Sequence, residues 1–230
     1  MVDRPTRRVD HVVHAVEDLE AAAIAYRDLG FTVTPRADHP FGTSNRLVVL
    51  DRSYLEIVAV TRPENLPITG FAARVAQHLL HQGQGITHVV LSSDHPEADL
   101  ETVGDLATGE IFSFSRPAPQ LEGPAITAEF ACVLLEAPAD LGMFLCHHAV
   151  PEAVWNEAAM HHPNGARALS AVTLPVEIPS LETLAMAAGV TGYGGGALDL
   201  AGVAFETGPA AIHFDVAVAA THFAGVDIGG

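Results

Sequence analysis

A short segment occurs twice in this chain, and this repeat limits what the chain can fold into. Segments 11–21 and 88–98 align without a gap and share His, Val and Val at their start and Glu and Ala at their end. Each reads as an apolar strand followed by an acidic helix start. Because internal repeats determine architecture, the sequence predicts a duplicated strand–helix unit. The matching histidines, His11 and His88, indicate a two-fold site with one ligand from each copy.

Turn residues and apolar alternation extend both copies to the same order of elements, which is strand, helix and three more strands. Asp18 is expected to cap the first helix, and Gly30 and Gly109 are expected to close the two helices. In the first copy the expected elements are strands 9–16, 31–35, 45–50 and 53–60 and helix 19–29. In the second copy they are strands 86–92, 110–114, 126–135 and 143–148 and helix 95–106.

These elements predict an α+β protein in which paired βαβββ modules form a curved mixed-sheet cup. A third, partial copy is expected from Ala168, with Ala171 at the ligand position and a final segment that frays. Its unpaired edge could be covered by its own chain or by a homodimer. The expected organisation is a first module at 1–62, a helical connector at 63–85, a second module at 86–150, and a connector with the partial third module at 151–230.

The composition argues against several classes of partner. The chain has 28 Asp and Glu against 11 Lys and Arg, for a formal net charge of −17. This acidity disfavours nucleic acid and anionic membranes as partners, and it fits a bacterial-type soluble surface. Two cysteines and the lack of a membrane-spanning run or a signal-peptide pattern predict a cytoplasmic protein. Without a Rossmann or P-loop motif, no organic cofactor is expected.

Several longer motifs carry a family resemblance. They are Asp10-His11-Val12-Val13, Leu29-Gly30-Phe31, Tyr54-Leu55-Glu56-Ile57, the stretch from His39-Pro40 to Asn45-Arg46, and the stretch from Phe144-Leu145-Cys146 to His162-Pro163-Asn164-Gly165. Together they resemble the glyoxalase-like families of the vicinal oxygen chelate superfamily, over residues 9 to about 175. The resemblance implies paired modules whose curved sheet holds a ligand on its concave face.

The resemblance also implies a metal centre. Its ligands would be His11 and His88 from the first strand of each module and Glu56 from the last strand of the first module. Two imidazoles and a carboxylate suit Zn, Fe, Ni, Mn or Co. Burial of a lone carboxylate on this apolar strand is expensive, which favours Glu56 as a ligand, and the alternative is a hydrogen-bonded buried acid that orients a substrate directly. Glu56 is also the candidate catalytic residue.

The fourth ligand position departs from the family pattern. Aligning Tyr54-Leu55-Glu56 with Phe144-Leu145-Cys146 places Cys146 where a metal enzyme would carry Glu. Cys146 could ligate as a thiolate, which would favour zinc. His148 lies two residues further along the same strand face and could reach the ion instead. A three-ligand site, or no metal at all, also stays open.

Three more residues are candidates for substrate binding. If Asp51 and Arg52 form a two-residue turn, Glu56 pairs with Leu47, and Asn45 lies on the same face one step away. Thr43 shares that face. His162 precedes a turn and could reach the rim of the cup, or could be a structural elbow.

The sequence therefore favours a metal-dependent lyase, isomerase or dioxygenase that acts on a small oxygenated molecule able to chelate the ion. The alternative is a metal-free cup that sequesters a small hydrophobic or aromatic compound. The set of His11, Glu56 and His88 favours the enzyme, whereas Cys146 in place of an acid favours the binding protein.

Overall fold

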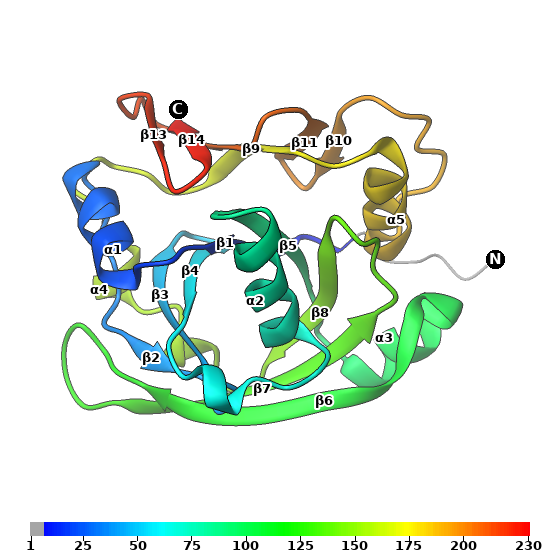
Figure 1. The fold of residues 1–230 in the computed structure, drawn as a ribbon, viewed down its shortest axis with the longest axis horizontal. Coiled ribbons are helices and arrows are strands. Elements are labelled where there is room, and N and C mark those ends of the chain that lie inside the picture. Colours follow the sequence, from blue (N-terminus) through cyan, green and yellow to red (C-terminus); the bar gives the residue numbers. More distant parts are fainter. Residues whose placement is uncertain (1–6) are drawn as a thin grey trace.

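The computed structural model describes residues 7–230, which form two β-sheets with helices packed around them (Figure 1). The first sheet has eight strands in the order β2-β3-β4-β1-β5-β8-β7-β6 and is strongly curved. Its strands are β1 (Val9–Ala15), β2 (Ala37–Asp38), β3 (Thr43–Val49), β4 (Tyr54–Val60), β5 (Gly85–Ser92), β6 (Ala107–Ala118), β7 (Ile126–Leu135) and β8 (Gly142–His148).

An approximate two-fold relation organises the first sheet. Strand β1 is parallel to β4, strand β5 is parallel to β8, and β1 and β5 run antiparallel at the centre. The two halves are thus the predicted βαβββ units, with helices α1 (Leu19–Asp28) and α3 (Pro96–Val103) after their first strands. The predicted cap is also confirmed, because the Asp18 side chain accepts hydrogen bonds from the first-turn backbone of α1.

The second sheet covers the outer face of the first. Its order is β10-β11-β9-β12-β14-β13, and its apolar side chains share one core with α1 and with the helix α5 (Ile178–Ala188). Val12 of β1 and Val89 of β5 belong to this core, which therefore reaches the centre of the first sheet. The strands are β9 (Leu169–Leu174), β10 (Leu198–Leu200), β11 (Val203–Thr207), β12 (Ala211–Phe214), β13 (Thr221–Phe223) and β14 (Val226–Gly229).

The connector helix α2 (Phe71–His81) occupies the concave side of the first sheet, where Figure 1 shows it inside the curve. It packs against β1, β4 and β5. Its Val75 is fully buried in a second core cluster that includes Val13 of β1 and Val90 of β5. The cup is therefore partly filled by the chain itself, which the amphipathic pattern of the helix did not reveal.

Three local predictions were wrong. Segment 31–35 is not a strand: Phe31 and Val33 are buried, and Phe31 packs against Phe214 of the second sheet rather than pairing with a neighbouring strand. Gly109 does not close a helix, because α3 ends at Val103 and a short 3-10 turn at 104–106 leads directly into β6. The chain end does not fray, because its last strands form a hairpin whose apolar side chains are buried.

Short helical turns complete the described chain: η1 (Pro63–Asn65), η2 (Gly104–Leu106), η3 (Pro151–Ala153) and α4 (Glu157–Met160). Across residues 7–230, no helix combines the length and the apolar character that crossing a membrane requires.

Candidate functional site

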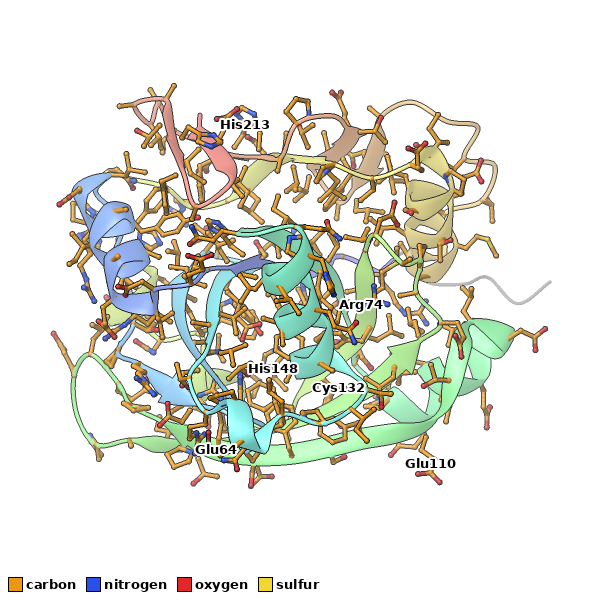
Figure 2. All side chains as sticks on the ribbon, in the orientation of Figure 1. Glu64, Arg74, Glu110, Cys132, His148 and His213 are labelled. Carbon is orange, nitrogen blue, oxygen red and sulfur yellow. The ribbon has the colours of Figure 1, made fainter. Side chains whose placement is uncertain are left out.

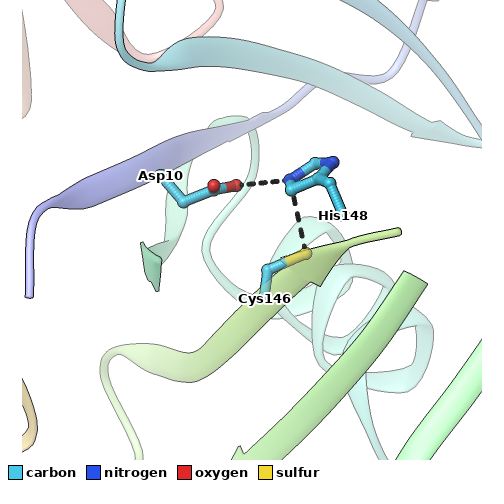
Figure 3. A group of neighbouring side chains, drawn as sticks. All are labelled: Asp10, Cys146 and His148. Atoms are coloured by element: carbon cyan, nitrogen blue, oxygen red, sulfur yellow. Dashed lines mark hydrogen bonds and ion pairs between the residues drawn. The ribbon is translucent and has the colours of Figure 1, made fainter. Parts of the chain in front are cut away.

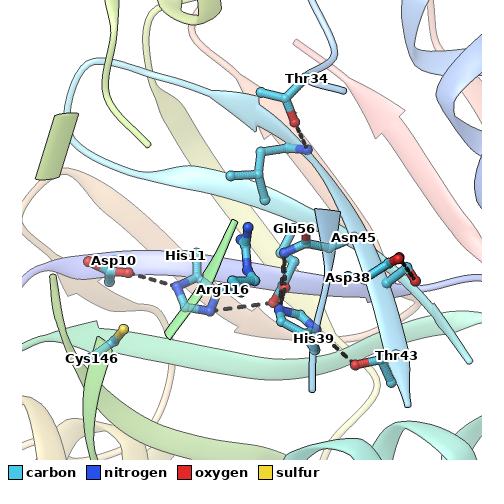
Figure 4. Close-up of polar contacts among 12 residues, drawn as sticks. Asp10, His11, Thr34, Asp38, His39, Thr43, Asn45, Glu56, Arg116 and Cys146 are labelled. Atoms are coloured by element: carbon cyan, nitrogen blue, oxygen red, sulfur yellow. Dashed lines mark hydrogen bonds and ion pairs between the residues drawn. The ribbon is translucent and has the colours of Figure 1, made fainter. Parts of the chain in front are cut away.

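The carboxylate of Glu56 lies at the centre of a buried polar cluster on the concave face (Figure 4). Nε2 of His11 is 3.7 Å from its Oε2, and Nε2 of His39 is 3.6 Å from its Oε1. Nδ2 of Asn45 donates a hydrogen bond of 2.6 Å to Oε1. Glu56 is only 4% exposed, so this carboxylate is held by protein groups and hardly by solvent.

The orientation of His11 is fixed by its neighbour in sequence. Nδ1 of His11 donates a hydrogen bond of 2.7 Å to Oδ1 of Asp10. Adjacent strand residues normally point to opposite faces, but β1 carries one extra residue here: Val9 pairs with Leu91, while His11 pairs with Val90. This bulge brings both side chains together. The hydrogen bond from Nδ1 to Asp10 therefore holds the ring with Nε2 directed toward Glu56.

Asp10 is fully buried yet ionised. Burial by itself would raise its pKa, but the nearby charges and the hydrogen bonds of His148 and His11 outweigh that effect and hold the pKa well below its ordinary value. Nε2 of His148 lies 3.0 Å from the same oxygen that accepts from His11. Asp10 therefore joins two imidazoles, one from each half of the first sheet.

His39 is the second imidazole that faces Glu56, and it comes from the loop between β2 and β3. Its Nδ1 is 2.8 Å from Oγ1 of Thr43, and its Nε2 lies 3.4 Å from Nδ2 of Asn45. Because the amide nitrogen can only donate, Nε2 of His39 is the acceptor. Burial lowers the pKa of His39 well below its ordinary value, which keeps the ring neutral. His39 was not predicted as a site residue, although it begins the stretch from His39 to Arg46 that carries part of the family resemblance.

The structure does not bring His88 to this cluster. Its ring contacts the rings of Phe71 and Phe144, and its Nδ1 bonds with the Thr87 hydroxyl. It lines a separate cavity of about 610 Å³ that also contains Arg74 of α2, which Figure 2 labels. A side chain at position 142 would collide with the His88 ring, so Gly142 makes room for it.

Strand register explains why a symmetric four-ligand centre does not form. In the first module His11 lies opposite Tyr54, and Glu56 is two residues further along β4. In the second module His88 lies opposite Gly142, so the counterpart of Glu56 is Phe144. The alignment of Glu56 with Cys146 was wrong by two residues. A phenyl ring cannot bind a metal, and the Phe144 ring packs against both His11 and His88.

Among residues 7–230, Asp10, Cys146 and His148 are the one set of three possible ligands that is this compact, whereas His11, His39 and Glu56 do not form such a set (Figure 3). The ligand atoms of Asp10, Cys146 and His148 all lie within 4.8 Å of one another, with 3.6 Å between Sγ of Cys146 and Nε2 of His148. Cys146 also lies directly across from Cys132 on β7. The hydrogen bond to the Cys132 thiol, followed by burial, raises the pKa of Cys146 well above its ordinary value, so it is a neutral thiol here.

Two of the three residues predicted to bind substrate lie in the polar cluster, and the third does not. Glu56 pairs with Leu47 as expected, and Asn45 and Thr43 belong to the polar cluster. His162 does not reach it. Backbone N–H of Thr32 donates to Nδ1 of His162, and Nε2 of His162 donates to the carbonyl of Val49, so the ring ties the connector to the first module.

A small cavity of about 50 Å³ opens onto the polar cluster. Its walls are mainly aromatic, and its polar lining includes His11, His39, Asn45, Glu56 and Arg116. Phe71, Leu134 and Phe144 line both this cavity and the larger one beside His88, so the two cavities are adjacent. The aromatic residues of the small cavity are Phe41, Tyr54, Phe71, Phe112, Phe114, Phe130 and Phe144.

The sequence matches one family model, and the fold is similar to those of solved structures. Residues 9–188 match the family model of the glyoxalase-like domain. A hypothetical protein from Staphylococcus aureus superposes with a TM-score of 0.67 at 12% identity, over 96% of this chain and 98% of that chain. A variant of 4-hydroxymandelate synthase from Streptomyces coelicolor superposes with a TM-score of 0.56 at 17% identity, over 92% of this chain and 64% of that chain. No curated protein matches the sequence.

Proposed function

Because this chain belongs to the glyoxalase-like domain family of the vicinal oxygen chelate superfamily, we propose that it is a divalent-metal-dependent enzyme acting on a small oxygenated molecule. His11, His39 and Glu56 would hold the ion. When bound, a divalent ion polarises an oxygen of the substrate and stabilises the charge that develops there. Lyase, isomerase and dioxygenase chemistry all use such a centre, and the identity of the ion separates them.

One observation carries this proposal. The Nε2 atoms of His11 and His39 face the same carboxylate at 3.7 and 3.6 Å, while their Nδ1 atoms are engaged by Asp10 and Thr43. Metal-binding histidines usually have the other ring nitrogen held by a carboxylate or another polar group, which fixes the tautomer. Two imidazoles and one carboxylate suit Fe, Mn, Co, Ni or Zn.

The remaining residues of the cavity have roles that follow from their contacts. Asn45 donates to Glu56 and so fixes the direction of its carboxylate. The aromatic walls make most of the cavity surface apolar and would hold the apolar part of a substrate. Tyr54 stacks on His11 with ring centroids 4.4 Å apart, which limits rotation of that imidazole.

The test is elemental analysis of protein purified without a metal-affinity column and reconstituted in turn with Fe, Mn, Co, Ni and Zn. About one ion per chain is expected in the wild type. His11→Ala, His39→Ala and Glu56→Gln should each lose the ion. His88→Ala is the matched control, since it removes a buried imidazole from the neighbouring cavity and should keep the ion. Loss of metal in His88→Ala with retention in His39→Ala would overturn the assignment.

The aromatic walls favour a second candidate function, a metal-free protein that sequesters a small aromatic compound. Its test is calorimetric titration of p-cresol into chelator-treated and metal-reconstituted protein. Equal affinity in both forms, without conversion of any ligand and without bound metal after reconstitution, would favour this candidate over the enzyme.

A further inference from the structure

Arg116 on β6 is a buried cation in the wall of the small cavity, and its charge is poorly matched by the protein. The residue is 6% exposed. Its one hydrogen bond among residues 7–230 runs from Nη1 to the carbonyl of Pro117 at 3.3 Å, and Nε has no partner there. No carboxylate of the described residues lies within ion-pair distance of it. Burying a cation in this state is costly, because the charge loses its hydration and gains no ion-pair partner in return.

From this arrangement we infer that Arg116 is the recognition residue for a carboxylate, and that the ligand of the cavity is a small carboxylic acid with an apolar body. The inference rests on the proposed function only in taking this cavity as the substrate site. It names the chemical class of the substrate and does not depend on the metal.

The free part of the guanidinium has the shape that a carboxylate requires. Nη1 is committed to Pro117, whereas neither Nε nor Nη2 donates to any residue in 7–230. These two N–H groups form one edge of the guanidinium fork, and a carboxylate accepts from such an edge through two parallel hydrogen bonds. The edge therefore suits a planar anion better than a single neutral acceptor.

The protein's own carboxylates are not available to take that place. Glu56, which shares the cavity with Arg116, already accepts from Asn45 and faces two imidazoles. Arg116 receives partial compensation from the charge of Glu56, which makes no ion pair with it, and from Phe130, whose ring centroid is 5.5 Å from the guanidinium carbon. Phe114 stacks on that ring at 4.8 Å. A ligand carboxylate at Arg116 would thus place its apolar body against aromatic rings.

The test measures binding of acid and amide pairs to the full chain. Acetate and benzoate are the probes, and acetamide and benzamide are their neutral counterparts. Dissociation constants are measured by NMR titration for the wild type, Arg116→Gln, Arg116→Lys and Arg74→Gln. Arg74 is the matched control because it lines the larger cavity, where it donates to the backbone of residues 138 and 139.

The wild type is expected to prefer at least one acid over its amide. Arg116→Gln should weaken binding of that acid by roughly 10-fold to 100-fold, the usual size of a hydrogen-bonded charge pair, and should leave amide binding unchanged. Arg116→Lys should recover part of the affinity, since it keeps the charge but not the fork. Arg74→Gln should bind as the wild type does.

Three outcomes would overturn the inference: no binding of either acid to the wild type, equal binding by Arg116→Gln, or loss of binding only in Arg74→Gln. Circular dichroism shows whether Arg116→Gln folds. If it does not, Arg116→Lys is the test variant, and unchanged acid binding by Arg116→Lys would show that the guanidinium fork does not bind the carboxylate. Metal content is measured on the same samples. Arg116-dependent acid binding without metal would refute the proposed function alone, whereas metal binding without acid binding would refute this inference alone.

Discussion

The carboxylate of Asp10 accepts a hydrogen bond of 2.7 Å from Nδ1 of His11, although the two residues are neighbours on one strand. The contact depends on the bulge in β1, and it leaves Nε2 of His11 directed at Glu56. The pair is a carboxylate–histidine arrangement of the kind that supports bound metals.

Asp10→Asn should therefore weaken metal binding without removing a ligand. The neutral amide no longer stabilises the polarised imidazole, so we expect affinity for Co²⁺ to fall by roughly 10-fold to 100-fold. Competition with a chromogenic chelator measures this affinity. Asp94→Asn, at an exposed position, serves as the control. Equal affinity in Asp10→Asn and the wild type would show that Asp10 does not support the ligand.

His14 should make the protein less stable as the pH falls. Burial lowers its pKa to about 4, from 6.5, and Nε2 donates to the carbonyl of Ala224 while Nδ1 meets the Tyr26 hydroxyl. Between these pH values the unfolded chain binds a proton that the folded chain does not. The stabilising contribution of neutral His14 to the free energy of unfolding is therefore complete above pH 6.5. It falls by roughly 3 kcal/mol as the pH drops toward 4.

Urea unfolding of the wild type and His14→Gln at several pH values between 4 and 7 measures this loss. The free energy of unfolding of His14→Gln should fall less steeply with decreasing pH. His39 and His88 also have lowered pKa values and stay in both proteins, so the difference between the two slopes isolates His14. Parallel slopes would contradict the assignment.

The two cysteines should resist modification in the folded protein. Both are buried, and the pKa of Cys146 is raised by its contact with Cys132 and by burial, so little thiolate forms at neutral pH. Iodoacetamide followed by mass spectrometry should find neither thiol alkylated in buffer and both alkylated in urea. Rapid labelling of Cys146 in the native protein would mean that it is a thiolate, as a zinc ligand or nucleophile would require.

Phe71 should hold helix α2 inside the cup. Its ring packs against His39, Phe41, His88 and Phe144. Phe71→Ala should lower the free energy of unfolding by about 2 kcal/mol, less than for a fully buried Phe because this residue is only half-buried. Ile68→Ala, just before the helix and 93% exposed, should change it by less than about 0.5 kcal/mol. Equal effects of the two variants would mean that Phe71 does not anchor the helix.

The sequence repeat was sufficient to predict the paired modules, because apolar alternation and turn residues are local signals that survive in both copies. The pairing of Glu56 with Leu47 followed from a two-residue turn in the same way. The error at Cys146 arose because a gapless motif alignment ignores where a strand starts. β8 begins at Gly142 opposite His88, which puts Phe144, and not Cys146, at the position of Glu56.

Three other features of the site could not be predicted, because no local pattern in the sequence indicates them. His39 lies in a loop, where no periodicity indicates which way a side chain points. The apolar stripe of α2 shows that the helix is buried on one side but not that it lies inside the cup against β1, β4 and β5. Arg116 lies two residues beyond the expected strand 110–114, on the longer β6 of the structure, and its lack of a partner depends on every residue packed around it.

The most direct test of the central claim is anomalous X-ray diffraction from crystals of the protein loaded with Co²⁺, measured at the cobalt absorption edge. We expect one strong peak within about 2.0–2.2 Å of Nε2 of His11, Nε2 of His39 and a carboxylate oxygen of Glu56, the bond lengths usual for such ligands. A peak among Asp10, Cys146 and His148, a peak beside His88, or no peak at all would contradict the central claim.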